Sequence, residues 1–109
     1  MSDRPAQSIF ARKVPLLILF AYEQGYEITF GDTWAKTGHK KNSFHYRRLA
    51  IDLNLFKNGK YLRSAKHHWA LGEFWESIGG SWGGRWRDAN HYSWGETKCI
   101  TQKVVTSIE

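Results

Sequence analysis

The sequence predicts a small α+β fold, a single domain in which helices pack on one side of an antiparallel sheet. The chain has 109 residues, which is enough for one hydrophobic core and too few for two. Two segments have the apolar spacing of helices, whereas shorter segments alternate apolar and polar residues as strands do. An Asn-Gly pair between two of these strands is typical of a hairpin, which joins antiparallel strands. We expect one domain over residues 1–109, with its core at about 8–94 and a tail, 95–109, that gives little signal.

The first expected element is a helix over residues 8–24, which Gly25 ends. It is the main core element because it carries a broad apolar face, formed by Ile9, Phe10, Val14, Leu17, Ile18 and Ala21. A short strand over 26–30 follows, because large residues alternate there with polar ones and a Gly-Asp turn comes next. Residues 37–42 are polar and basic, and we expect a loop.

Residues 49–56 predict a strand with two different faces. Apolar and polar side chains alternate with period two, so the aliphatic face consists of Leu49, Ile51, Leu53 and Leu55. Asp52 and Asn54 then lie on the opposite face. The turn at 57–60 contains the Asn-Gly pair, and residues 61–62 begin the returning strand.

A second helix is expected over residues 64–78, with Ser64 as its N-cap and Gly79-Gly80 as its end. Its expected buried set consists of Trp69, Leu71, Phe74, Trp75 and Ile78. Residues 79–86 are rich in Gly and Trp, and we expect a loop in which bulky rings pack beside a cleft. This loop does not match a phosphate-binding motif, since no strand precedes it and no Lys-Ser/Thr pair follows it. A last short strand is expected at 91–94.

Composition excludes several classes of protein. With 41% hydrophobic and 24% charged residues, the chain is not disordered throughout. Its single cysteine, Cys99, excludes an intrachain disulfide framework and a thiolate-cluster zinc site, and we expect a small buried side chain there. Any bound metal must therefore be held by His, Asp or Glu. The apolar run at 14–22 is shorter than the roughly 20 residues of a membrane span, and no secretory signal is visible, so we expect synthesis in the cytoplasm.

Positive charge is concentrated in one part of the chain, residues 36–66, here called the basic stretch. The whole chain has a net charge of +6, but the basic stretch contains nine Lys and Arg residues and one acid, Asp52. Such a field favours a polyanionic partner such as nucleic acid or an anionic envelope. A solvated basic surface with no partner is an equally simple interpretation.

Three residues have the chemistry of a catalytic zinc site: His45, Asp52 and His91. Two imidazoles and one carboxylate leave a fourth position for water, whose pKa the metal lowers to about 7. Asp52 interrupts an aliphatic strand, where a carboxylate without a partner is costly, so it needs a partner such as a cation. Asp88, three residues before His91, is a candidate general base. The other histidines, His39, His67 and His68, are weaker candidate ligands.

These residues resemble those of a known family. Residues 43–52 read Ser-Phe-His-Tyr-Arg-Arg-Leu-Ala-Ile-Asp, and residues 88–91 read Asp-Ala-Asn-His after a Trp-Gly-Gly-Arg-Trp run. Both segments resemble the signatures of the bacterial and phage zinc D,D-peptidase and L-alanyl-D-glutamate peptidase family, which has a hedgehog-like zinc fold. The resemblance covers about 26–94. It implies one Zn²⁺ per chain, held by His45, Asp52 and His91, with Asp88 as the catalytic acid/base.

The chain departs from the family at two points. Arg48 stands where the family usually has Gly, and the upstream arginine that binds the substrate's carboxylate or carbonyl is missing from the segment 31–36. Lys36 or a nearby arginine such as Arg48 is then the candidate replacement, although Lys is a poorer bidentate partner than Arg. Trp34 and Trp86 are candidate substrate contacts in the cleft wall. Ser43 and Asn90 are candidate supporting residues that hydrogen-bond to backbone or ligand.

The resemblance implies a peptidase that cleaves an amide bond in peptidoglycan stem peptides, in the manner of a phage endolysin. We expect a monomer that is made in the host cytoplasm, reaches the wall after the inner membrane is opened, and binds no nucleic acid. The resemblance does not distinguish an L-alanyl-D-glutamate bond from a D,D-bond. Two alternatives remain open: a basic, Trp-rich nucleic-acid-binding module, and a family member that has kept the fold and lost activity.

Overall fold

The structure is a computed structural model that describes residues 2–96. Cys99 and the expected tail beyond residue 96 lie outside the described residues. The elements, in chain order, are α1 (Arg4–Glu23), β1 (Glu27–Phe30), β2 (Ala50–Lys57), β3 (Lys60–Leu62), α2 (Ala65–Ser77), β4 (Ser81–Trp82), the 3-10 helix η1 (Gly83–Trp86) and β5 (His91–Ser93).

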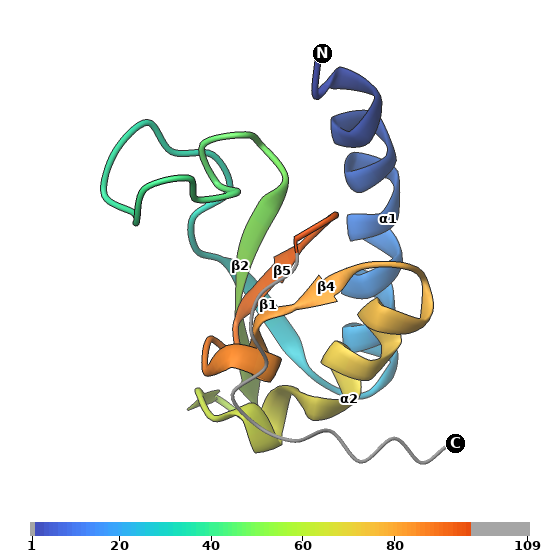
Figure 1. Cartoon of the computed structure of the whole chain (residues 1–109). Helices are drawn as coiled ribbons and strands as arrows, with labels where there is room; N and C mark the ends of the chain where they lie inside the picture. The colour runs from blue at the N-terminus through green and yellow to red at the C-terminus, as the bar shows by residue number, and fades with distance from the viewer. Residues whose placement is uncertain (1, 97–109) are drawn as a thin grey trace.

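Strand β2 is the centre of an antiparallel sheet whose strands follow the order β1, β2, β5, β4, while β3 also pairs with β2 (Figure 1). The first half of β2 pairs with β5, and its second half pairs with both β1 and β3. Asp52 of β2 lies directly opposite His91 of β5 in this register. The pairing brings together two residues that are distant in the sequence.

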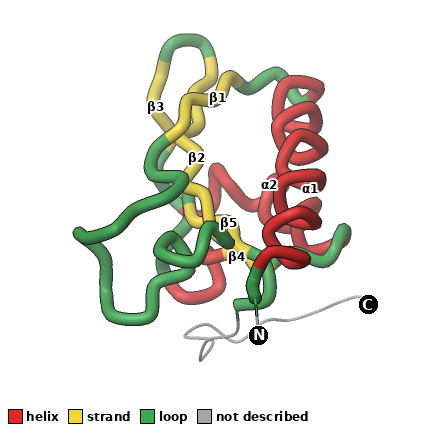
Figure 2. The backbone as a smooth tube through the Cα atoms, turned by 90° about the horizontal axis from the view of Figure 1, so that it is seen from above, coloured by secondary structure: helices red, strands yellow, loops and turns green. Residues whose placement is uncertain are grey.

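The hydrophobic core lies between the sheet and the two helices, which are on the same side of the sheet (Figure 2). The predicted aliphatic face of β2 is confirmed: Leu49, Ile51, Leu53 and Leu55 are all buried. The fold class predicted from the sequence, α+β with helices on one side of an antiparallel sheet, is therefore confirmed. Much of the long segment between β1 and β2 projects away from the helices (Figure 2), but its end returns to helix α1, where the Gln7 side chain donates to the Arg47 carbonyl.

Helix α1 begins four residues before the expected start, at Arg4, and Pro5 occupies its first turn, where a missing N–H costs nothing. Its buried face is narrower than predicted. Phe10, Leu17 and Ala21 are buried, whereas Ile9 is 37% exposed. Helix α1 contacts the core along one stripe, so Ile9 lies at its border.

Helix α2 is in the expected place, but its buried face differs from the prediction. His68 and Gly72 are buried, whereas Trp69, expected in the core, is 40% exposed. His68 occupies a core position because its Nδ1 hydrogen-bonds with the Tyr92 hydroxyl at 2.7 Å. Trp69 instead covers the Arg85 guanidinium, at 4.7 Å from its ring centre.

The segment 79–86 was expected to be a loop, but it contains β4 and η1. Large rings do pack there, but Trp82 is fully buried in the core and does not lie beside a cleft as expected. A Cβ added at Gly72 would lie 2.1 Å from the Trp82 ring, so glycine makes room for this indole. Within residues 2–96, the helices are too short or too polar to cross a membrane.

Candidate metal centre

Two of the three candidate ligands face each other across the β2–β5 pair. Asp52 and His91 are direct cross-strand partners, so their side chains leave the same face of the sheet. The Asp52 Oδ1 atom lies 3.5 Å from His91 Nδ1. This face is opposite the aliphatic one, as the alternation in β2 predicts.

The third candidate, His45, comes from the tight turn that precedes β2. The Leu49 N–H donates to the Phe44 carbonyl, and the Ser43 hydroxyl accepts a hydrogen bond from the His45 N–H. Arg48 has φ 59°, in the left-handed region that favours glycine. Arg48 thus adopts a left-handed conformation at the position where the family that the sequence resembles usually has glycine. The turn directs His45 Nε2 to 3.2 Å from Asp52 Oδ1.

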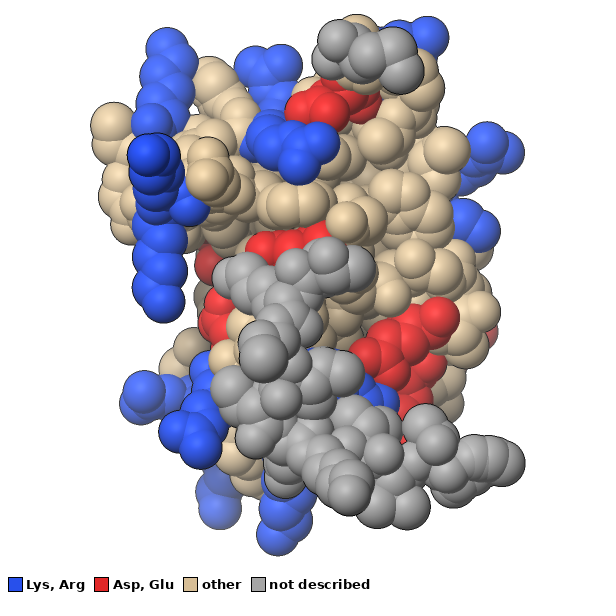
Figure 3. Space-filling view, in the orientation of Figure 1, with Lys and Arg blue, Asp and Glu red and all other residues tan. Residues whose placement is uncertain are grey.

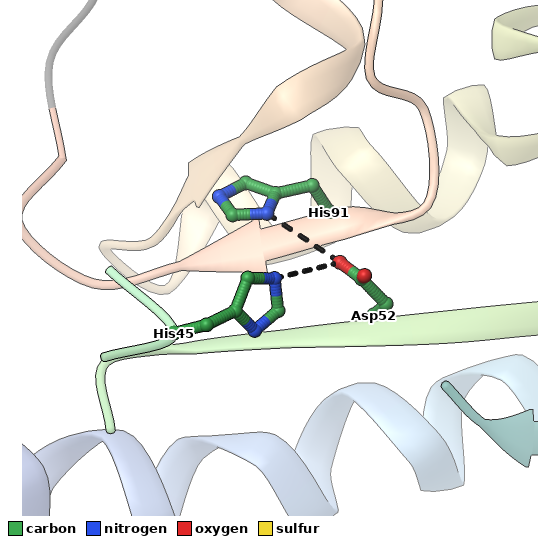
Figure 4. Close-up of side chains that lie close together, drawn as sticks. All are labelled: His45, Asp52 and His91. Carbon is green, nitrogen blue, oxygen red and sulfur yellow. Dashed lines mark hydrogen bonds and ion pairs between the residues drawn. The ribbon is translucent and has the colours of Figure 1, made fainter. Parts of the chain in front are cut away.

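His45, Asp52 and His91 converge in space (Figure 4). Their donor atoms all lie within 4.8 Å of one another, and no other group of this kind occurs in the described part of the chain. Burial opposes ionisation of Asp52, but hydrogen bonds from both histidines outweigh it and lower its pKa to about 2. Burial also disfavours the charged form of His91, but its bonds with Asp52 and Glu96 raise its pKa to about 9. The pKa of His45 is raised for the same kind of reason, against the effect of burial.

The donor set fits a zinc ion. Two imidazole nitrogens and one carboxylate oxygen are ligands that zinc accepts, and three protein ligands leave the open position of a catalytic site. Both imidazoles approach the same oxygen, Asp52 Oδ1, so the three donor atoms face one point. A cation bound there by all three side chains would replace these hydrogen bonds, and its binding would release protons from the histidines.

Asp88, the candidate acid/base, lies beside the three ligands without joining them. Its Oδ2 atom is 3.8 Å from His91 Nδ1, and its side chain is 52% exposed. The backbone fixes it, because the Asp88 N–H donates to the Gly83 carbonyl and the His91 N–H donates to the Asp88 carbonyl. A carboxylate held in this way is accessible to water and to a substrate.

A cleft of about 640 Å³ opens beside the three ligands. Residues 38–44 form one wall, and residues 86–88, His91 and Glu96 form the other. Ser43 and Trp86, both candidate site residues, belong to these walls. Lys40 and Lys41 lie on the rim, and Lys and Arg side chains gather over the loop between β1 and β2, at the left of Figure 3. The basic stretch therefore places part of its charge at the cleft.

The other candidate substrate residues lie outside this cleft. Trp34 is 44% exposed, with the Arg48 guanidinium 4.4 Å and the Lys36 ammonium 5.5 Å from its ring centre. These three residues form a separate cluster near the turn. Asn90 lines a second, smaller hollow together with Arg87 and Asp88. The structure thus brings together the predicted ligands and the acid/base, but not all of the predicted substrate contacts.

The remaining histidines have other partners. The His39 ring stacks on His45 at 4.3 Å, and its Nε2 lies 2.8 Å from Asp32. His67 hydrogen-bonds with the Ser64 hydroxyl. Burial of His68 lowers its pKa to about 4, which keeps the ring neutral at pH 7. None of the three joins the group of candidate ligands.

One residue of the site was not predicted. Glu96 is 5% exposed, and its Oε1 lies 2.6 Å from His91 Nε2. It falls in the segment 95–109, whose sequence shows no periodicity, and its contact depends on how the chain turns after β5. An acid a few residues beyond a candidate ligand is the only signal for it in the sequence.

Comparison with known proteins agrees with this geometry. A family model described as D-alanyl-D-alanine carboxypeptidase matches residues 37–94, which is more than half of the chain and includes all three candidate ligands and Asp88. A comparison with curated proteins finds no match. The chain therefore belongs to the M15 peptidase family.

Proposed function

We propose that the protein is a zinc-dependent peptidase that hydrolyses an amide bond in peptidoglycan stem peptides, as a phage endolysin does. The observation that carries this proposal is the convergence of His45, Asp52 and His91 beside a cleft whose wall includes His91 and Asp88. The scissile bond is an L-alanyl-D-glutamate bond or a D,D-bond. The enzyme would act as a monomer, made in the host cytoplasm and released to the wall once the inner membrane is opened.

His45, Asp52 and His91 would hold the zinc ion. When bound, zinc supplies a Lewis acid that polarises the scissile carbonyl and lowers the pKa of water. The low pKa of Asp52 keeps this carboxylate ionised at neutral pH, so it is ready to bind a cation. The two histidines are buried at 2% and 5% exposure, so the surrounding chain holds both rings in place.

Asp88 would transfer the proton. A carboxylate in this place accepts a proton from the attacking water and then gives it to the leaving amine, so one group serves as base and acid. Its exposed position and its backbone hydrogen bonds suit this role, because the carboxylate reaches the cleft while the chain at Asp88 stays fixed.

The cations of the cleft support an anionic substrate. Lys40, Lys41 and Arg87 line it, and stem peptides and bacterial envelopes carry carboxylates and phosphates. Arg85 is a poor candidate for the missing anchoring arginine, because its guanidinium makes a bidentate pair with Glu76. Arg87, which borders both the cleft and the smaller hollow next to Asp88, is better placed.

The nucleic-acid-binding alternative has less support. It would use the charge of the basic stretch, but it gives no role to an ionised aspartate held between two buried histidines. The other alternative is an inactive family member, which would lack a replacement for the anchoring arginine. The digestion experiment that tests the proposal also tests this alternative.

The test is digestion of purified peptidoglycan by the zinc-reconstituted protein, with mass spectrometry of the released peptides. We expect one new amine terminus per cut, whose position identifies the bond. A zinc-loaded protein that leaves the stem peptides intact would refute the proposal. Asp88→Asn is the matched control, because it keeps the size of the side chain and removes the base.

A further inference from the structure

Glu96 holds the far side of the His91 ring. His91 presents Nδ1 to Asp52 and Asp88, and its other nitrogen, Nε2, lies 2.6 Å from Glu96 Oε1. The same Oε1 accepts a hydrogen bond from the Ser93 hydroxyl at 2.7 Å. Glu96 and Ser93 are 5% and 0% exposed, so both side chains are buried although Glu96 borders the cleft.

The arrangement fixes which nitrogen of His91 is free. A carboxylate only accepts hydrogen bonds, so Nε2 carries a hydrogen and donates it to Glu96. In the neutral ring the lone pair is then on Nδ1, the nitrogen that faces Asp52. A carboxylate behind a histidine ligand also makes the ring a better electron donor and holds its orientation.

Strand pairing and hydrogen bonds hold Glu96 in its position. Ser93 is the last residue of β5 and pairs with both Ala50 of β2 and Ser81 of β4, so its backbone is held between two neighbouring strands. A buried carboxylate is costly unless it is hydrogen-bonded, and here two donors converge on one oxygen. The two hydrogen bonds therefore offset the cost of burying Glu96 and hold its carboxylate against His91.

We infer that Glu96 is a positioning residue of the metal centre, which sets the tautomer and orientation of His91 for zinc through the contact from its Oε1 to His91 Nε2. This inference rests on the proposed function, since it assigns to Glu96 a role toward the same zinc ion. Ser93 acts one step further away by fixing the carboxylate.

The experiment measures zinc affinity by competition with a chelator, in the full chain and in Glu96→Ala and Glu96→Gln. Loss of such a contact weakens metal binding by about 10–100-fold, which we expect for Glu96→Ala. Glu96→Gln keeps a carbonyl oxygen that can accept from Nε2, so we expect a smaller loss. In the metal-free protein, ¹⁵N-histidine labelling should show a bonded His91 Nε2–H proton, and Glu96→Ala should abolish its signal.

Glu76→Ala is the matched control. It also removes a carboxylate from a charged pair, the one with Arg85, but it does not touch the three ligands. Equal loss of zinc affinity in Glu76→Ala and Glu96→Ala would overturn the inference, because the loss would then follow from stability alone. Unchanged affinity in Glu96→Ala would overturn it as well. Failure of the unaltered chain to bind zinc would refute the proposed function itself, and the two failures are thus distinguishable.

Discussion

Gly83 supports the metal centre by the absence of a side chain. A Cβ added at this position would lie 2.3 Å from the Asp88 carbonyl oxygen and 2.7 Å from the Cβ atom of His91. Since such contacts are essentially never shorter than 3.0 Å, Gly83→Ala must separate these groups by about 0.7 Å, which is overpacking of the kind that costs about 1–3 kcal/mol. Metal–ligand distances tolerate only about 0.2 Å. We expect Gly83→Ala to weaken zinc binding by about 10–100-fold, in the range of other changes that disturb ligand orientation.

Zinc affinity by chelator competition, together with urea unfolding of the metal-free protein, tests this prediction. The control is Gly72→Ala, whose Cβ would lie 2.1 Å from the Trp82 ring, away from the ligands. Both variants should lose stability, but only Gly83→Ala should lose zinc affinity. If Gly83→Ala binds zinc as tightly as the unaltered protein does, the site does not depend on the close approach of Gly83 to His91, and the reasoning is wrong.

Three further predictions concern the ligands, the core and the surface. Asp52→Ala should lose zinc because it removes a ligand, whereas Asp88→Ala should keep zinc and lose turnover by about 10²–10⁴-fold. Zinc content and peptide cleavage distinguish the two variants. Loss of zinc from Asp88→Ala would contradict the assignment of Asp88 as acid/base. Burial lowers the pKa of His68 from 6.5 to about 4, so between these pH values the folded state binds fewer protons than the unfolded state. The free energy of unfolding should therefore fall by up to about 3 kcal/mol as the pH drops from 6.5 to 4. Urea unfolding of the metal-free protein across this range should show that His68→Gln lacks this part of the pH dependence, and equal slopes would count against it. The double change Lys40→Glu and Lys41→Glu should slow digestion of whole walls at low salt and have less effect as salt screens the charge; a defect independent of salt would place these lysines in the chemistry instead.

The sequence predicts strand β2 correctly because one strict period decides its faces. Leu49, Ile51, Leu53 and Leu55 occupy every second position, so the place of Asp52 on the other face follows directly. No such rule decides which face of α2 is buried. Trp69 is more apolar than His68, yet His68 is the buried one, because Tyr92 in a distant strand offers it a hydrogen bond.

In the candidate site, too, some residues could be predicted from the sequence and others could not. His45, Asp52, Asp88 and His91 belong to two short sequence signatures, so they are found without knowledge of the fold. The role of Glu96 depends on a turn after β5 that leaves no periodic pattern. Likewise, the separation of Trp34 from the cleft depends on the course of the long loop before β2, which local sequence does not determine.

The direct pairing of Asp52 with His91 has a consequence for the order of events during synthesis. These two ligands lie roughly 40 residues apart in the chain, so a zinc ion that joins them closes a long loop, whose entropy would otherwise favour the unfolded chain. A zinc ion bound there would act as a reversible cross-link between β2, in the middle of the chain, and β5. A nascent chain that stops before β5 has only two of the three candidate ligands, so a complete metal centre would form only after β5 is added.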